Sequence, residues 1–277
     1  MDCVSPFFCC ALRCAQVHPS AAALGAAAVR LFCDVAGAAI ARKGGAVVAL
    51  SGGSLPSLLA GLASAQLDWA KVHVFLADER CVAASDPECS MSALKAAFLS
   101  AVPIPAANVH GLNGSSDAQA EADAYQAALL ALPAALLPRS AAGIPALDLV
   151  LLGVGPDGHT ASLFPHRAAL AVADRAVLAV TDSPKPPAAR VSLSLPTLNA
   201  AGVVAFFAAG PAKAEVVQRV LECQALPGAL PAQLVRPAPP GDLRWCLDAQ
   251  AAAQLRTADW ANPNKWPRSE VPAAPKA

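Results

Sequence analysis

The chain has 277 residues, enough to bury one large core, which excludes a peptide or a disulfide-stapled mini-domain. Hydrophobic residues make up 56% and charged residues only 14%, and this balance excludes a disordered or polyelectrolyte chain. Twenty basic and twenty acidic residues cancel, so no overall field gathers nucleic acid or a membrane surface, and the expected partners are small molecules.

Short β-like runs alternate with longer alanine-rich stretches, which is the pattern of βαβ units. Strands are predicted over 13–17, 46–50, 72–77, 147–153, 176–180, 191–195 and 203–208, with a last strand near Trp245. Helices are predicted over 21–42, 56–65, 90–98, 116–132, 160–164, 197–200 and 213–221. We therefore expect an α/β protein of three layers, with a mainly parallel twisted sheet and helices on both faces.

No shift in composition divides the chain. We expect an N-terminal extension and first strand region over 1–16, a single α/β domain over 17–260 and a flexible tail over 261–277. A bilayer-spanning helix needs roughly 18 or more uncharged, strongly apolar residues in a row, and we expect no such run in this chain. The nine cysteines, four of them within the first fourteen residues, are interpreted as reduced thiols of a cytoplasmic protein, with a plastid as the alternative location.

A glycine-serine loop, Ser51-Gly52-Gly53-Ser54, joins a predicted strand to a predicted helix. Two consecutive glycines let the backbone approach a ligand closely, and free N–H groups at a helix start attract an anion. The loop is therefore predicted to cradle a phosphate; an ordinary tight turn with Ser54 as the helix cap is the alternative. It lacks the lysine of a P-loop, which argues against a nucleotide triphosphatase.

A charged triplet, Asp78-Glu79-Arg80, follows the predicted strand 72–77 at the same carboxyl edge of the sheet. A carboxylate at the end of an apolar strand is costly unless it has a partner. Arg80 is predicted to bind a phosphate or carboxylate, and Asp78 to orient a water, a hydroxyl or a histidine. A solvated turn is the alternative interpretation.

The most informative loop, within 153–165, places Gly155-Pro156-Asp157-Gly158-His159 after a strand. Its G-x-G-x-x-G pattern alone would indicate a dinucleotide enzyme, but a pyrophosphate would have to sit against Asp157, and the helix predicted over 160–164 is too short. His159, at the start of that helix, is predicted to be a general base kept neutral by the positive helix end. No metal site is predicted, because no further ligand completes a set with this histidine.

Three further cations lie close to predicted strand ends. Lys185 and Arg190 belong to a proline-braced segment, 182–190, where proline reduces the entropy lost when two cations are held to grip an anion. Lys213 lies in the first turn of the helix predicted over 213–221. Incidental surface charge is the alternative for all three residues.

Together these segments resemble the 6-phosphogluconolactonases, over about residues 17–252. The likeness rests on the Ser-Gly-Gly-Ser loop, the Asp-Glu-Arg triplet, the glycine-histidine loop and the Ser-Pro-Lys-Pro-Pro-x-x-Arg segment. It implies a modified Rossmann-like sheet of the type shared with glucosamine-6-phosphate deaminases and ribose-5-phosphate isomerases. It also implies hydrolysis of 6-phospho-D-glucono-1,5-lactone to 6-phosphogluconate in the oxidative pentose phosphate pathway, with no metal or organic cofactor.

For that reaction His159 is expected to take a proton from the attacking water and to return it to the ring oxygen. Asp78 or Asp157 would hold the imidazole tautomer. N–H groups of the Gly52–Gly53 turn or of the Gly155–Gly158 turn would face the developing oxyanion. The cations expected to bind the phosphate and hydroxyl groups are Arg80, Lys185, Arg190 and Lys213.

Some alternatives stay open. A sugar-phosphate isomerase or deaminase on the same fold, or a non-catalytic sugar-phosphate binder, would use a similar site, although residues 160–165 differ from the deaminase sequence. Ala83 and the stretch Glu88-Cys89-Ser90-Met91 depart from the usual residues of the lactonases, which leaves ligand contacts there undecided. A monomer or a weak dimer is expected.

Overall fold

The computed structural model describes residues 14–223 and 230–256. Most of the predicted N-terminal extension and all of the predicted tail, 261–277, lie outside the described residues. The strands are β1 (Cys14–His18), β2 (Ala46–Leu50), β3 (Val72–Leu76), β4 (Asp78–Arg80), β5 (Leu149–Leu152), β6 (Val177–Val180), β7 (Arg190–Leu193), β8 (Val203–Ala208) and β9 (Asp242–Asp248). The α-helices are α1 (Ala21–Lys43), α2 (Leu55–Leu59), α3 (Ser90–Ala97), α4 (Ala118–Leu130), α5 (Leu195–Ala200), α6 (Ala214–Glu222) and α7 (Pro231–Leu234).

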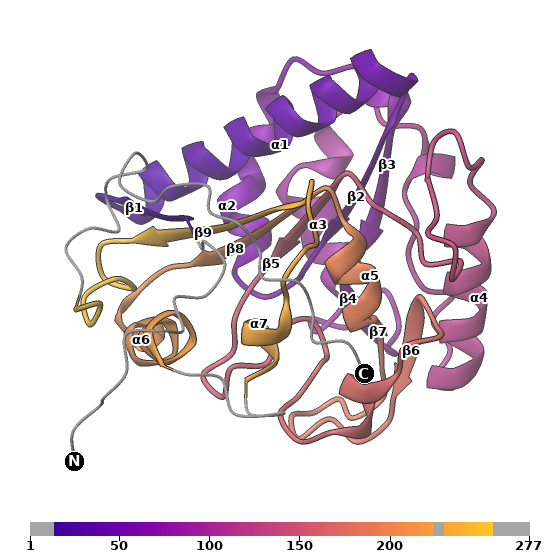
Figure 1. Ribbon diagram of the computed structural model, residues 1–277. Helices are drawn as coiled ribbons and strands as arrows, with labels where there is room; N and C mark the ends of the chain where they lie inside the picture. Colours follow the sequence, from indigo (N-terminus) through magenta and orange to yellow (C-terminus); the bar gives the residue numbers. More distant parts are fainter. Residues whose placement is uncertain (1–13, 224–229, 257–277) are drawn as a thin grey trace.

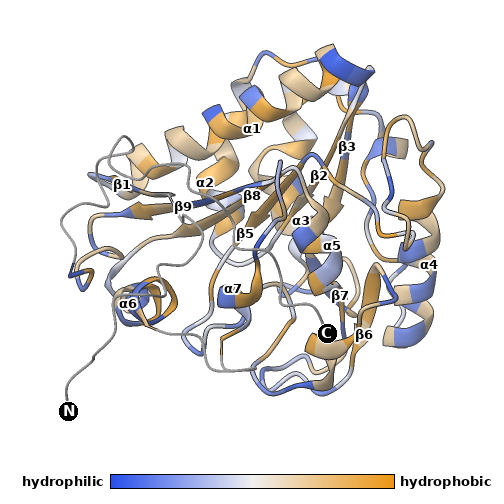
Figure 2. Ribbon diagram, in the orientation of Figure 1, coloured by the Kyte–Doolittle hydropathy of each residue, from blue (hydrophilic) through white to orange (hydrophobic). Residues whose placement is uncertain are grey.

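Six parallel strands form the central sheet in the order β1-β9-β8-β5-β2-β3, which confirms the predicted mainly parallel α/β architecture (Figure 1). Every residue of β2 and β5 is buried, and for this reason their sequences are continuous apolar runs instead of alternating ones. Figure 2 shows the central strands β2 and β5 of this sheet as apolar, and it shows hydrophilic residues on the outer side of α1. β2 and β8 begin and end at the predicted residues.

A second, smaller sheet is antiparallel, in the order β4-β7-β6. The sequence pattern predicts β6 and β7 as strands of one mainly parallel sheet and does not predict β4. The short proline-rich segment between β6 and β7 allows an antiparallel return, whereas a parallel pair needs a crossover of a dozen or more residues. This small sheet carries Arg80 and Arg190 to the site described below.

α1 covers one face of the parallel sheet, and its buried side runs from Leu24 to Ala39. Ser20 caps its first turn by accepting the N–H of Ala23 at 3.2 Å, and Gly44, with a φ of 85°, ends it. By length and composition α1 could cross a membrane, although Arg30 and Asp34 lie within it and it therefore offers no window of 18 uncharged residues. Its buried side packs against α2, β2 and β9, which is the placement of a core helix.

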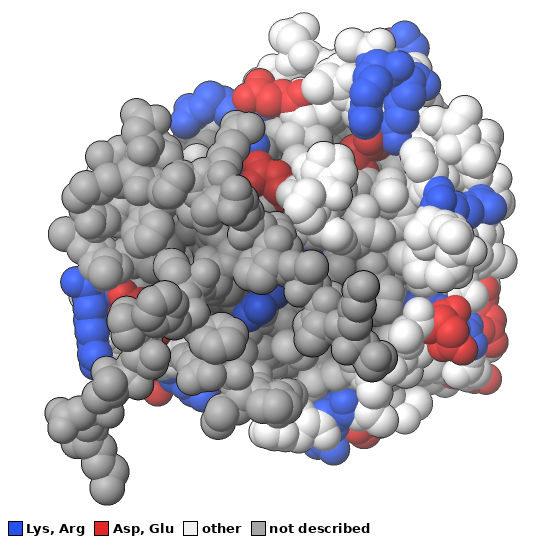
Figure 3. All heavy atoms as spheres, in the orientation of Figure 1, with Lys and Arg blue, Asp and Glu red and all other residues white. Residues whose placement is uncertain are grey.

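The carboxyl ends of four neighbouring strands, β8, β5, β2 and β3, share one edge of the sheet. α1 and α2 lie over one face, and α5, α6 and α7 lie on the opposite side (Figure 1). Each of the four strands is followed by a segment that the sequence analysis singled out, so the strand order brings distant parts of the chain together. Basic and acidic side chains are interspersed over the coloured part of the surface in Figure 3, in line with the balanced charge.

The cysteine side chains that the structure describes are free thiols: Cys33, Cys81, Cys89, Cys223 and Cys246. Cys3, Cys9 and Cys10 lie outside the described residues.

Candidate active site

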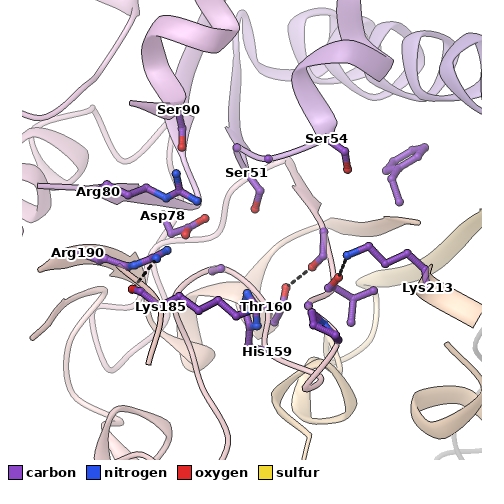
Figure 4. A pocket seen from close by; sticks show the side chains of 18 residues that line it. Ser51, Ser54, Asp78, Arg80, Ser90, His159, Thr160, Lys185, Arg190 and Lys213 are labelled. Atoms are coloured by element: carbon purple, nitrogen blue, oxygen red, sulfur yellow. Dashed lines mark hydrogen bonds between the residues drawn. The ribbon is translucent and has the colours of Figure 1, made fainter. Parts of the chain in front are cut away.

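A polar cavity of about 190 Å³ opens at the carboxyl edge of the sheet (Figure 4). Segments that follow β2, β3, β5 and β8 all contribute to its wall, which makes it the place where a small ligand would meet several polar groups. The lining residues are Ser51, Gly52, Gly53, Ser54, Asp78, Arg80, Ser90, Gly153, Val154, Gly155, Pro156, His159, Thr160, Ala161, Lys185, Arg190, Phe207 and Lys213.

The loop after β2 presents a hydroxyl and main-chain donors to the cavity. The Oγ of Ser51 is buried without a hydrogen-bond partner in the described chain, and the N–H groups of Gly52 and Gly53 donate to no described residue. Gly53 has a φ of 66°, a left-handed value that suits glycine. A Cβ at Gly52 would lie 2.2 Å from the Oγ of Ser90, so glycine leaves room for the start of α3. Ser54, the alternative helix cap, makes no capping hydrogen bond.

No helix begins at His159, which corrects the prediction over 160–164. Thr160 and Leu163 instead form an isolated antiparallel bridge, and the φ of 48° at Ala161 is incompatible with a right-handed helix. The turn is fixed by a contact within the loop, because Thr160 donates its hydroxyl to the carbonyl of Gly153 at 2.9 Å. A helix dipole therefore does not act on His159, and the predicted reason for its neutrality was wrong.

The imidazole of His159 pairs with Asp157, with 2.5 Å between Nδ1 and Oδ1. Because an ionised carboxylate only accepts hydrogen bonds, Nδ1 carries the proton and Nε2 is the basic nitrogen. Burial lowers the pKa of His159 below its usual value, and the hydrogen bond and charge of Asp157 offset only part of this effect. The ring is thus a neutral group that can accept a proton at neutral pH.

The two carboxylates predicted as alternatives for holding the imidazole have different partners. Burial opposes the ionisation of Asp157, but its hydrogen bond to His159 and the Lys185 Nζ 3.9 Å away outweigh burial and lower the pKa of Asp157. Asp78 instead accepts a hydrogen bond from the hydroxyl of Ser162 at 2.8 Å. In this structure, therefore, Asp157 orients the histidine, whereas the Oδ2 of Asp78 is bound by Ser162.

Gly155 and Gly158 allow the backbone conformation of the histidine loop. A Cβ at Gly155 would lie 2.0 Å from the ring of His159, whereas Gly158 has a φ of 81° and does not line the cavity. The N–H of Gly155 donates to the carbonyl of His159, and the N–H of Gly158 to the carbonyl of Gly155, both at 2.9 Å. The donors of this turn are therefore already used within the loop.

The alternation of β4 divides the charged triplet between two sides. Asp78 and Arg80 line the cavity. Glu79 is buried and accepts the N–H of Ser90 at 2.9 Å and that of Met91 at 2.8 Å. Glu79 thus caps the start of α3, a role that the sequence analysis missed because it did not recognise the triplet as a strand.

Arg80 and Arg190 are paired across β4 and β7. Arg80 donates Nη1 to the carboxylate of Glu88 at 2.6 Å, while its Nε is buried without a partner in the described chain. Arg190 is 4% exposed and donates to the carbonyls of residues 185–187, so it shapes the turn that carries Lys185. Burial, and then the charge of Arg80, lower the pKa of Arg190.

Lys213 ends a 3-10 turn after β8, η6 (Pro211–Lys213), and donates Nζ to the carbonyl of Val154 at 2.8 Å. Burial, and then the charge of Lys185, lower the pKa of Lys213. Since Val154 belongs to the loop that carries His159, Lys213 braces that loop while it adds positive charge to the cavity.

Every predicted site residue lines the cavity except Asp157 and Gly158, and Asp157 acts through His159. Ser90, Thr160 and Phe207 also line it but were not among the predicted site residues. Ser90 lies in the stretch whose ligand contacts were left undecided, and its position soon after the triplet was the available signal. Among the described residues, no group of three or more His, Cys, Asp or Glu side chains is placed to hold a metal ion.

Comparison with known proteins gives a consistent result. The family described as glucosamine-6-phosphate isomerases/6-phosphogluconolactonase matches residues 19–245. A 6-phosphogluconolactonase from Synechocystis is 39% identical over 220 residues, which cover 79% of this chain and 88% of the relative. The 6-phosphogluconolactonase of Homo sapiens is 40% identical over 253 residues, or 87% and 93% of the two chains. The structure of 6-phosphogluconolactonase from Trypanosoma brucei, 29% identical, gives a TM-score of 0.77 and covers 89% of this chain and 100% of that one.

Proposed function

Since the chain belongs to the glucosamine-6-phosphate isomerase/6-phosphogluconolactonase family, we propose that its cavity hydrolyses 6-phospho-D-glucono-1,5-lactone to 6-phospho-D-gluconate, a step of the oxidative pentose phosphate pathway. The single observation that carries the proposal is the pairing of a neutral His159 with Asp157 in a cavity that also holds four cations. A neutral base suits ester hydrolysis, and cations suit a phosphorylated substrate. The catalytic unit proposed for this reaction is one domain over 17–260.

In the proposed mechanism Nε2 of His159 takes a proton from water while the water oxygen attacks C1 of the lactone. The bond between C1 and the ring oxygen then breaks, and the proton on Nε2 passes to that oxygen. The products are the C5 hydroxyl and a carboxylic acid, which ionises at neutral pH. Asp157 accepts the hydrogen bond from Nδ1 throughout and stabilises the imidazolium that exists between the two steps.

The oxygen on C1 gains negative charge during the attack and needs donors that are free beforehand. The N–H groups of Gly52 and Gly53 are free in the described chain, whereas those of Gly155 and Gly158 are used within their loop. We therefore assign the oxyanion to the Gly52–Gly53 turn. One such donor is worth roughly 10²–10³ in rate.

The substrate is proposed to bind through the cations that line the cavity, together with the unpartnered hydroxyl of Ser51 and with Ser54. These cations are Arg80, Lys185, Arg190 and Lys213. A monomer or weak dimer in the cytoplasm, with a plastid as the alternative location, stays a prediction that sedimentation and imaging of a tagged chain would test.

The test is lactone hydrolysis coupled to 6-phosphogluconate dehydrogenase. Purified protein is expected to raise the rate well above that of spontaneous hydrolysis. An isomerase or deaminase of the same fold would instead consume glucosamine 6-phosphate and leave the lactone rate unchanged. A non-catalytic binder would bind 6-phosphogluconate without turnover, and either of these results would overturn the proposal.

A further inference from the structure

The hydroxyl of Ser90, at the start of α3, faces the cavity. The main-chain N–H groups of this turn are already bound by another residue and do not face a ligand. Glu79 accepts the N–H groups of Ser90 and Met91. Ser90 is 4% exposed and lines the cavity, and Figure 4 shows its side chain pointing from α3 toward the space beside Ser51 and Asp78. Its Oγ makes no hydrogen bond in the described chain and lies over the α carbon of Gly52.

The charges around Ser90 indicate which kind of ligand group fits there. The two arginines at this end are matched by carboxylates, since Arg80 pairs with Glu88 at 2.6 Å and Arg190 lies within reach of the charges of Asp78, Glu88 and Glu79. At the other end, two lysines share one carboxylate, Asp157. The end that holds Ser90 therefore has no excess positive charge for an anion.

An uncharged hydroxyl fits this end chemically. It can accept a hydrogen bond from Ser90 and donate one to Asp78, whose Oδ2 is bound by Ser162 and whose Oδ1 has no hydrogen-bond partner in the described chain. We propose that Ser90 is a specificity-determining residue whose hydroxyl binds a ring hydroxyl of the sugar lactone, an inference that rests on the proposed function.

The test pairs a substitution in the protein with a deletion in the substrate. Ser90→Ala and the wild type are compared on the parent lactone and on its 2-deoxy, 3-deoxy and 4-deoxy derivatives. We expect kcat/KM for the parent to fall about 3- to 10-fold, mainly through KM, because one uncharged hydrogen bond is lost. For the derivative that lacks the partner hydroxyl, the two proteins should have equal kcat/KM.

The matched control is Ser92→Ala, on the same helix, whose hydroxyl donates to the carbonyl of Ala84 and does not line the cavity. It should leave the ratios among the four lactones unchanged. An equal effect of Ser90→Ala on all four lactones, or no effect on any, would overturn the assignment while leaving the lactonase proposal intact. If the wild type does not accelerate hydrolysis of the parent lactone, the lactonase proposal fails, and binding of 6-phosphogluconate and its deoxy derivatives to both proteins is measured by calorimetry instead. The assignment of Ser90 is then overturned if Ser90→Ala weakens binding of none of these compounds, or of all of them equally.

Discussion

The imidazole of His159 lies against the α carbon of Gly155, in the space that a side chain at position 155 would occupy. A Cβ there would fall 2.0 Å from both Cε1 and Nδ1 of the ring. The backbone thus supports one side of the imidazole while Asp157 holds its Nδ1 edge. The position of the proposed base depends on glycine at residue 155.

Gly155→Ala should displace the imidazole and lower kcat by roughly 10²-fold, because a shift of about 1 Å in a reacting group has that effect. The added methyl group meets a side chain and not the core, so circular dichroism should show a folded protein. The lactone assay at saturating substrate measures the loss. A variant with kcat within twofold of the wild type would contradict the prediction, because it would show that displacing the imidazole of His159 does not slow the reaction.

Gly37→Ala is the contrasting glycine substitution. Gly37 lies inside α1, and a Cβ there would meet no atom within 4 Å. Alanine lowers the conformational entropy of the unfolded chain and favours the helix, so the free energy of unfolding should rise by about 0.5–1 kcal/mol. Urea titration measures the change, and kcat should stay at the wild-type value.

The pH dependence of kcat/KM should follow the neutral form of His159. Its pKa lies below 6.5 because of burial, so the rate should be constant above that pH and fall at lower pH, where the imidazole gains a proton. Asp157 raises this pKa, so Asp157→Asn should move the acidic limb to still lower pH. It should also lower the plateau by roughly 10- to 100-fold, because Nδ1–H loses its charged acceptor.

This pH profile is measured for both proteins from pH 4.5 to about 8, within which the limb should lie. A limb that moves to higher pH in Asp157→Asn, or a wild-type limb well above pH 6.5, would contradict the account. The first result would show that Asp157 does not stabilise protonated His159, and the second would show that burial does not dominate the pKa of His159.

Much of the site could be predicted because parallel strands place their carboxyl ends on one edge. The glycine-serine loop and the histidine loop follow β2 and β5, which are neighbours, and this alone brings Ser51 near His159. The apolar runs that mark these strands arise from burial on both faces, so their positions are readable from the sequence.

Other features depend on contacts that local sequence does not contain. The run from Thr160 to Phe164 has helical composition, but Ser162 is fixed by a hydrogen bond to Asp78, which lies 84 residues away in the chain. The role of Glu79 follows only once β4 is recognised as a strand, since the alternation then separates it from Asp78 and Arg80.

Glu79→Ala should destabilise the protein by about 2–3 kcal/mol, because it leaves buried N–H groups at the start of α3 without an acceptor. Urea titration gives the change in the free energy of unfolding. Glu88→Ala is the matched control in the same segment, since its carboxylate is half exposed and its ion pair with Arg80 should contribute about 1 kcal/mol or less. Equal losses in the two variants would contradict a capping role for Glu79.

The most direct measurement compares His159→Ala with the wild type in two assays, lactone hydrolysis and calorimetric binding of 6-phosphogluconate. We predict that kcat falls by roughly 10²–10⁴, the range for removal of a general base, while the dissociation constant of the product changes only a few-fold. A substituted protein that hydrolyses the lactone at the wild-type rate would contradict the claim that His159 activates the water.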